Sequence, residues 1–103
     1  MLQIMTDFFS SLELSSEILK NLDSLGYTSM TPIQAQSLPH ILNGKDVIGQ
    51  GKTGSGKTAA FGLGLLASLD ATLFEVQSLV LCPTRELADQ VAKALRQLAR
   101  TTP

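Results

Sequence analysis

Hydrophobic residues recur at helical spacing in two segments of the first half of the chain. In residues 15–25 the apolar positions follow an i, i+4, i+7 pattern behind Ser15, a residue type that favours the N-cap of a helix. Residues 31–44 begin with the sequence TPIQ, which combines a cap residue, a proline at the first helical position and a glutamine three residues after the cap. The pattern therefore predicts two helices, capped by Ser15 and Thr31.

The second half of the chain alternates short apolar runs with helical patterns. Residues 46–50 have the pattern of a short strand and residues 78–82 that of a buried strand, and a helical segment follows each of them. The first of these helical segments, residues 59–69, has almost no polar face, which is typical of a helix inside a layered structure. The second has one apolar face that runs from Leu87 to Leu98. Strands that alternate with helices predict an α/β fold in which helices flank a parallel sheet.

The composition restricts the class of protein. Hydrophobic residues make up 44% of the 103 residues and charged residues 17%, which excludes a disordered chain and fits one small domain. The single cysteine, Cys82, cannot form an internal disulfide, and the longest apolar stretch, residues 59–69, is too short to span a bilayer. The net charge of -1 means that any contact with nucleic acid is local. We expect a cytoplasmic monomer without membrane contact.

A glycine-rich segment at residues 51–58, GKTGSGKT, matches the phosphate-binding pattern GxxxxGK[ST] between a predicted strand and a predicted helix. Glycines in such a P-loop let backbone N–H groups converge on phosphate oxygens at the positive end of the following helix. Lys57 would then contact the β- and γ-phosphates, and the Thr58 hydroxyl would bind Mg²⁺. The alternative is a flexible connector, which leaves unexplained why Lys57 stands where its charge opposes the helix dipole.

Several segments together resemble the motifs of the DEAD-box RNA helicases. They are the Q motif within residues 7–34, motif I at the P-loop of residues 51–58, and motif Ia at residues 83–88. The stretches that carry the resemblance read GYTSMTPIQ, GKDV, KTGSGKT and PTRELA, and Phe9 stands upstream where the family places an isolated aromatic residue. Within the family the chain resembles the bacterial DbpA type. The resemblance implies that residues 1–103 form the first part of a RecA-like ATP-binding domain.

The resemblance also implies ATP and Mg²⁺ as cofactors. Gln34 would bind the adenine edge through paired hydrogen bonds, and Phe9 or Tyr27 would pack against or near the base. The residues that would surround the phosphates are Thr53, Gly54, Ser55, Gly56, Lys57 and Thr58. The candidate catalytic residues among them are Lys57 and Thr58, with Thr58 also the metal ligand. The residues alone leave a second interpretation of Gln34, as the capping-box partner of the preceding threonine.

RNA is the macromolecular partner that the resemblance implies, and in complete DbpA-type proteins this is ribosomal RNA. Pro83, Thr84 and Arg85 of motif Ia would contact the sugar-phosphate backbone, which positions a strand without reading its sequence. The alternative interpretation is local, with Pro83 ending a strand, Thr84 capping the next helix and Arg85 solvated. Arg85 opposes the dipole of that helix, and an approaching phosphate would relieve this.

A carboxylate that could hold Mg²⁺ for hydrolysis is missing from the sequence pattern. No apolar run ends in Asp-Glu, Asp46 stands at the beginning of its predicted strand rather than at its end, and Asp70 follows a helix. By resemblance, the rest of the first RecA-like domain with its DEAD motif and the whole second domain are absent, so we expect this chain alone to be inactive.

The function implied for the parent protein is RNA-stimulated ATP hydrolysis coupled to local RNA unwinding. Two other function classes remain open. One is a different P-loop enzyme, such as a small kinase or GTPase, which the adenine-binding roles of Gln34 and Phe9 would exclude. The other is a truncated nucleotide-binding or interaction fragment without turnover.

Overall fold

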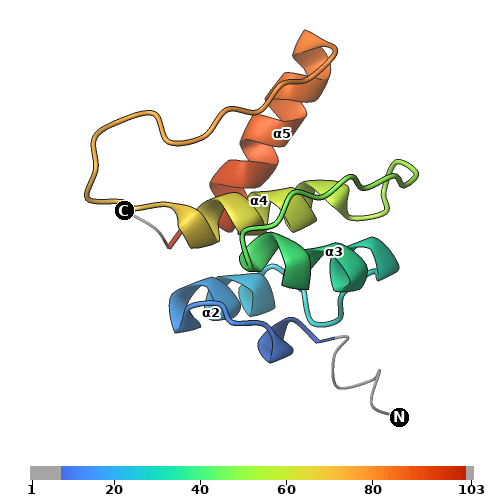
Figure 1. Ribbon diagram of the computed structural model, residues 1–103, viewed down its shortest axis with the longest axis vertical. Coiled ribbons are helices and arrows are strands. Elements are labelled where there is room, and N and C mark those ends of the chain that lie inside the picture. The colour runs from blue at the N-terminus through green and yellow to red at the C-terminus, as the bar shows by residue number, and fades with distance from the viewer. Residues whose placement is uncertain (1–7, 102–103) are drawn as a thin grey trace.

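The computed structural model describes residues 8–101, which form one short 3-10 helix and four α-helices (Figure 1). In chain order the elements are η1 (Phe9–Ser11), α2 (Ser16–Ser24), α3 (Pro32–Leu42), α4 (Lys57–Ser68) and α5 (Arg85–Leu98). Residues 1–7 and 102–103 of the predicted domain, including residue 7 at which the predicted Q-motif region begins, lie outside the described residues. The helices predicted from the sequence are confirmed, with ends that differ by one or two residues.

Local hydrogen bonds cap the N-terminal ends of α2 and α3, the first two predicted helices. The Ser15 Oγ accepts a hydrogen bond from the backbone N–H of Ile18 at 3.2 Å and so caps α2. At the start of α3, the Gln34 Oε1 accepts a hydrogen bond from the backbone N–H of Thr31 at 2.9 Å. The Thr31 Oγ1 itself is buried and has no hydrogen-bond partner among the described residues. The glutamine therefore supplies the hydrogen-bonded half of the capping box.

The apolar helix α4 lies between α3 and α5 (Figure 1). Both neighbours approach it at glycines. A Cβ atom at Gly64 would collide with the Ile41 Cγ2 of α3, and a Cβ at Gly62 would lie 2.8 Å from the Leu95 Cδ2 of α5. These contacts explain why α4 lacks a polar face, since two of its sides are covered. In residues 8–101 no helix is both long enough and apolar enough to cross a membrane.

One hydrophobic core joins the helices, and the N-terminal aromatic residue of η1 is part of it. Its buried side chains are Phe9, Ile18, Leu22, Met30, Leu38, Ala59, Ala60, Leu63 and Leu98. Leu38 of α3 and Leu63 of α4 both belong to this core, and both are completely buried. The core therefore connects the predicted Q-motif region to the helix that follows the P-loop.

The predicted parallel sheet is not formed in residues 8–101. Residues 46–50 and 78–82 are neither helical nor paired as strands, and the isolated bridge in the described chain joins Phe8 to Ser29 in antiparallel orientation. The side chains expected inside a sheet are open to solvent, with Ile48 96% and Leu81 85% exposed. A strand needs a neighbouring strand to satisfy its backbone hydrogen bonds, and these two segments have none. The flanking helices of the predicted α/β fold are thus present without the sheet.

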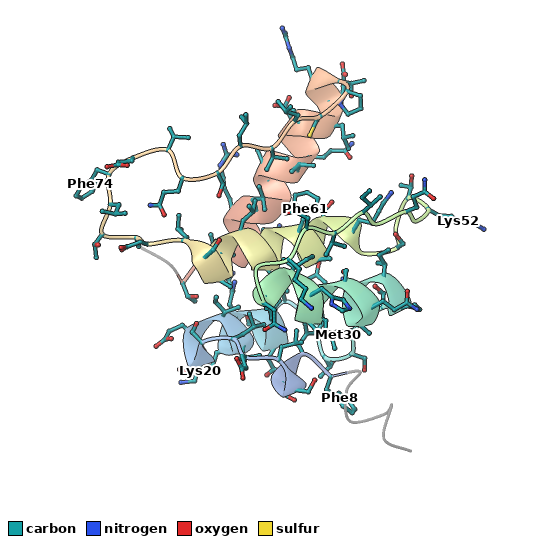
Figure 2. All side chains as sticks on the ribbon, viewed as in Figure 1. Phe8, Lys20, Met30, Lys52, Phe61 and Phe74 are labelled. Carbon is teal, nitrogen blue, oxygen red and sulfur yellow. The ribbon has the colours of Figure 1, made fainter. Side chains whose placement is uncertain are left out.

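The connection between α4 and α5 projects from the helices, with the fully exposed Phe74 at its outer turn (Figure 2). Hydrogen bonds fix its first residues. The Asp70 Oδ1 accepts hydrogen bonds from the backbone N–H and the hydroxyl of Thr72, and these bonds lower the pKa of the Asp70 carboxyl. The Gln77 Nε2 donates to the backbone carbonyl of Asp70 at 2.7 Å. The connection is therefore locally ordered although most of its side chains are exposed.

Candidate functional site

The P-loop leads directly into α4, and Gly56 is the N-cap of that helix. Gly54 and Gly56 have φ angles of +84° and +91°, a left-handed conformation that residues with a Cβ rarely adopt. The backbone N–H of Ser55 donates to the carbonyl of Lys52 at 3.0 Å, which closes the turn. The glycines predicted to shape this loop therefore do so through their backbone conformation.

The loop presents unused hydrogen-bond donors at the start of α4. Within residues 8–101, the backbone N–H groups of Gly56, Lys57 and Thr58 donate to no backbone carbonyl. The Ser55 Oγ is also buried without a hydrogen-bond partner. Unpaired donors at the positive end of a helix attract anions. The geometry therefore fits a phosphate group, as the sequence pattern predicts.

Lys57 lies in the first turn of α4 with an exposed side chain. Its Nζ donates to the backbone carbonyl of Gly51 at 2.5 Å, so the side chain folds back over the loop. Lys52 stands at the outer end of the same loop (Figure 2). A phosphate bound by the loop would compete with the Gly51 carbonyl for the Lys57 ammonium group, and a charged oxygen is the stronger partner.

Thr58 is a half-buried residue in the first turn of α4, and its hydroxyl offers one oxygen to a metal ion. In the described part of the chain, no group of three or more His, Cys, Asp or Glu side chains is arranged to hold a metal. Mg²⁺ is commonly bound by one or two protein oxygens together with substrate phosphates and water. Thr58 fits such a shared site but cannot form one alone.

Gln34 joins α3 to the P-loop. Its side chain is 1% exposed, and its Nε2 donates to the carbonyl of Gly56 at 3.0 Å while its Oε1 accepts from Thr31. Gly56 lies so close to α3 that an added Cβ would collide with the Gln34 Nε2 and lie 2.9 Å from the Thr31 Oγ1. The capping interpretation of Gln34 is confirmed. The bridge to Gly56 was not predicted, because no local pattern relates two residues from different elements.

The two aromatic residues predicted near the base lie against each other. Phe9 is buried in the core, and its ring meets that of Tyr27 edge to face, with 6.0 Å between centroids and 81° between planes. Tyr27 is 39% exposed. The backbone N–H of Phe9 donates to the carbonyl of Thr28 at 3.2 Å, which fixes η1 beside this segment. Tyr27 is therefore the ring of the pair with open surface.

Motif Ia occupies the start of α5. The Thr84 Oγ1 accepts a hydrogen bond from the backbone N–H of Leu87 at 3.1 Å and caps the helix, which confirms the local interpretation of Thr84. Pro83 and Arg85 are exposed beside it. No hydrogen bond between motif Ia and the P-loop is found within the described chain. These residues lie at the end of α5 that extends away from the other helices (Figure 1).

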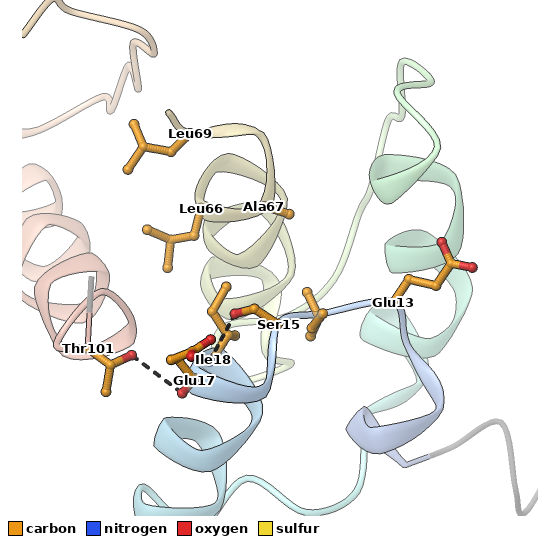
Figure 3. A pocket seen from close by; sticks show the side chains of 9 residues that line it. Glu13, Ser15, Glu17, Ile18, Leu66, Ala67, Leu69 and Thr101 are labelled. Carbon is orange, nitrogen blue, oxygen red and sulfur yellow. Dashed lines mark hydrogen bonds between the residues drawn. The ribbon is translucent and has the colours of Figure 1, made fainter. Parts of the chain in front are cut away.

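A cavity of about 380 Å³ lies between the beginning of α2 and the end of α4 (Figure 3). Ser15, Glu17, Ile18 and Leu66 are among the residues that line it. None of the predicted nucleotide or RNA residues contributes to its walls. The cavity is therefore separate from the P-loop.

Comparisons with known proteins identify relatives over almost the whole chain. A family model described as DEAD/DEAH box helicase matches residues 31–103. The chain is 65% identical over 99 residues to the ATP-dependent RNA helicase DbpA of Escherichia coli (strain K12), covering 96% of this chain and 22% of that protein. It is 54% identical over 92 residues to the ATP-dependent RNA helicase DeaD of the same strain, covering 89% of this chain and 15% of that protein. The chain thus spans less than a quarter of either relative.

Two solved structures superpose closely on this chain. Saccharomyces cerevisiae Dbp5 L327V, bound to Gle1 H337R and IP6, superposes with a TM-score of 0.88 at 33% identity. A DEAD box protein from the hyperthermophile Methanococcus jannaschii superposes with a TM-score of 0.83 at 37% identity. The matches cover 93% and 88% of this chain and 25% of each of those chains. The helices described above are therefore those of a partial RecA-like helicase domain.

Proposed function

Because the chain belongs to the DEAD/DEAH box helicase family, we propose that it is the ATP-binding and first RNA-contacting portion of a DEAD-box RNA helicase. The observation that carries the proposal is the P-loop, where two glycines are left-handed and three consecutive N–H groups at the start of α4 have no backbone partner within residues 8–101. In the complete protein this portion would serve ATP hydrolysis coupled to local RNA unwinding. The names of the relatives, ATP-dependent RNA helicases, support that reaction.

The P-loop residues would bind and orient the triphosphate. Residues 53–58 surround the phosphates, and Lys57 moves from the Gly51 carbonyl to the β- and γ-phosphate oxygens. Mg²⁺ supplies charge neutralisation when it is bound with ATP, and Thr58 contributes one of its oxygen ligands. The helix dipole of α4 and the free N–H groups add fixed positive charge at the same place.

Gln34 would select adenine without giving up its internal hydrogen bonds. A glutamine amide has two N–H donors and two lone pairs, and the structure uses one of each. The remaining N–H suits the adenine N7 and the remaining lone pair suits the N6 amino group. Since Gln34 is almost completely buried, nucleotide binding has to open its surroundings. Tyr27, with Phe9 behind it, would provide the adjacent aromatic surface.

RNA would approach the exposed start of α5. Thr84 and Arg85 present donors beside Pro83 at a helix N-terminus, and these suit a sugar-phosphate backbone. We propose ribosomal RNA as the target of the complete protein, on the strength of its similarity to DbpA. We also propose that the protein is a cytoplasmic monomer without membrane contact.

Nucleotide selectivity tests the adenine role of Gln34. We expect the unaltered chain to bind ATP in preference to GTP. Gln34→Ala should lower the affinity for ATP about tenfold and reduce the preference for ATP, because two hydrogen bonds of roughly 0.5–1.5 kcal/mol each are lost. Fluorescent-nucleotide displacement by ATP and GTP measures both quantities.

Gln36→Ala is the matched control, because Gln36 lies on the same helix with an exposed side chain. Its nucleotide affinities should equal those of the unaltered chain. If Gln34→Ala lowers the melting temperature but leaves ATP affinity and preference unchanged, Gln34 is only a cap. If GTP displaces the probe from the unaltered chain as well as ATP does, a different class of P-loop protein is indicated.

Hydrolysis by this chain should be undetectable with or without RNA. The reason is chemical: in its sequence no apolar run ends in a carboxylate pair, which would hold Mg²⁺ and the attacking water. Phosphate release is the measurement, made on a sample in which ATP binding has first been demonstrated. RNA-stimulated release of phosphate from such a sample would show that the chain is a complete ATPase.

A further inference from the structure

Asn21 is a buried polar residue outside the nucleotide and RNA motifs. It lies on α2 and is 2% exposed. Its Nδ2 donates to two backbone carbonyls at the end of α5, that of Gln97 at 2.8 Å and that of Leu98 at 3.0 Å. The last carbonyls of a helix have no partner within it, and leaving them buried and unpaired is costly. The Gln97 carbonyl also accepts from the backbone N–H of Arg100 at 3.4 Å, so the buried bond to the Leu98 carbonyl is the more important of the two. One side chain of α2 thus caps the C-terminal end of α5.

Other contacts at the same end of α5 surround this amide. Leu98 is buried in the core. The Arg100 Nη2 donates to the Ser24 Oγ at 2.9 Å, and the Thr101 Oγ1 donates to the Glu17 carbonyl at 3.4 Å. Both of these hydrogen bonds are exposed. Asn21 is therefore the buried polar link between α2 and α5, and the other two links face competition from water.

The opposite end of α5 has little support of its own. Residues 85–90 are all exposed, and Val91 is the first buried residue of the helix. Figure 1 shows this end extending beyond the other helices. A helix of this length spans about 21 Å, so a tilt of roughly 10° about its anchored end would move its start by roughly 4 Å. Such a shift exceeds the tolerance of a hydrogen bond.

We propose that Asn21 is a positioning residue for RNA binding. It holds the C-terminal end of α5, which also packs against α4, and thereby helps to set where Thr84 and Arg85 at the other end meet the RNA backbone. The inference rests on the proposed function, since it assumes that motif Ia contacts RNA. Asn21 contacts neither RNA nor nucleotide in this arrangement, so its effect is transmitted by the helix.

The orientation of α5 is the first readout. Spin labels at Glu86→Cys on α5 and Gln36→Cys on α3, in a Cys82→Ser background, report the distance between two exposed positions. Asn21→Ala should broaden or shift this distance by several ångströms. Asn21→Asp keeps the side-chain volume but places an oxygen against the two carbonyls. It should change the spin-label distance at least as much as Asn21→Ala. Ser24→Ala removes an exposed partner of Arg100 and should leave the distance unchanged.

Binding to RNA is the second readout, measured by fluorescence anisotropy with a labelled single-stranded RNA oligonucleotide. Circular dichroism first fixes a temperature at which each variant is folded. We expect Asn21→Ala to weaken RNA binding at least fivefold while ATP affinity stays within twofold. Arg85→Ala should cost less affinity in the Asn21→Ala background than in the unaltered chain, because both changes affect the same contact. A general loss of stability would instead lower the affinity for both RNA and ATP.

Two contrary outcomes are distinguishable. In the first, the unaltered chain binds RNA through Arg85, but both Asn21 variants leave the spin-label distance unchanged and the RNA affinity within twofold. The positioning role is then refuted, and the proposed function stands. If the unaltered chain does not bind RNA, or Arg85→Ala has no effect on binding, the proposed role of motif Ia fails and the inference fails with it.

Discussion

Lys57→Ala should lower the affinity of the chain for ATP by roughly 10- to 100-fold while leaving its thermal stability unchanged or slightly raised. The loss follows from removing a charged hydrogen bond to phosphate, worth about 1.5–3 kcal/mol. The stability follows from the position of Lys57, because its ammonium group opposes the dipole of α4 and is bonded only to an exposed carbonyl of Gly51. Alanine is also a better helix former than lysine.

Isothermal titration with ATP and Mg²⁺ measures the affinity, and circular dichroism measures the melting temperature. Lys52→Ala is the matched control, because it removes the same charge from the outer end of the same loop. Its ATP affinity should change no more than about threefold, as expected for a more distant and screened charge. Equal losses from the two variants would show that the loop attracts ATP only through its net charge.

Gly56→Ala should be the most disruptive single change in the P-loop. Alanine at φ +91° costs about 1–2 kcal/mol, and the new Cβ would collide with the Gln34 amide and crowd the Thr31 hydroxyl. Losing the hydrogen bond from Gln34 to Gly56 adds about 1 kcal/mol. The expected decrease in the free energy of unfolding is therefore about 2–3 kcal/mol, accompanied by loss of detectable ATP binding.

Gly54→Ala separates the two causes. Gly54 has almost the same φ, +84°, but an added Cβ would meet no atom within 4 Å. Urea unfolding of this variant should show only the backbone part, about 1–2 kcal/mol. If Gly54→Ala and Gly56→Ala are equally destabilising, the contact between the P-loop and α3 contributes nothing to stability.

The helix starts and the P-loop could be predicted from the sequence because local chemistry determines them. Ser15 reaches an N–H group three residues ahead, Gln34 reaches one three residues behind, and the glycines of the P-loop act through their own φ angles. Each of these interactions lies within a few residues of chain. A sequence pattern of the same length can therefore reveal it.

Interactions between distant residues could not be predicted in this way. The bond from Gln34 to Gly56 spans 22 residues and that from Asn21 to Gln97 spans 76, and neither has a spacing that a local pattern could show. The strand prediction shows the same limit. Residues 46–50 and 78–82 have the composition of strands, but pairing depends on a neighbour that no property of the segment itself provides.

The segment between α4 and α5, which is not paired as a strand, also affects association between copies of the chain. Between α4 and α5, Phe74, Val76, Leu79 and Leu81 are exposed on backbone that no strand covers. Apolar side chains beside open backbone donors and acceptors favour association between copies, and this association grows with concentration. We therefore expect this connection to limit the concentration at which the chain stays monomeric. The affinities above are best measured at the lowest protein concentration that each method allows.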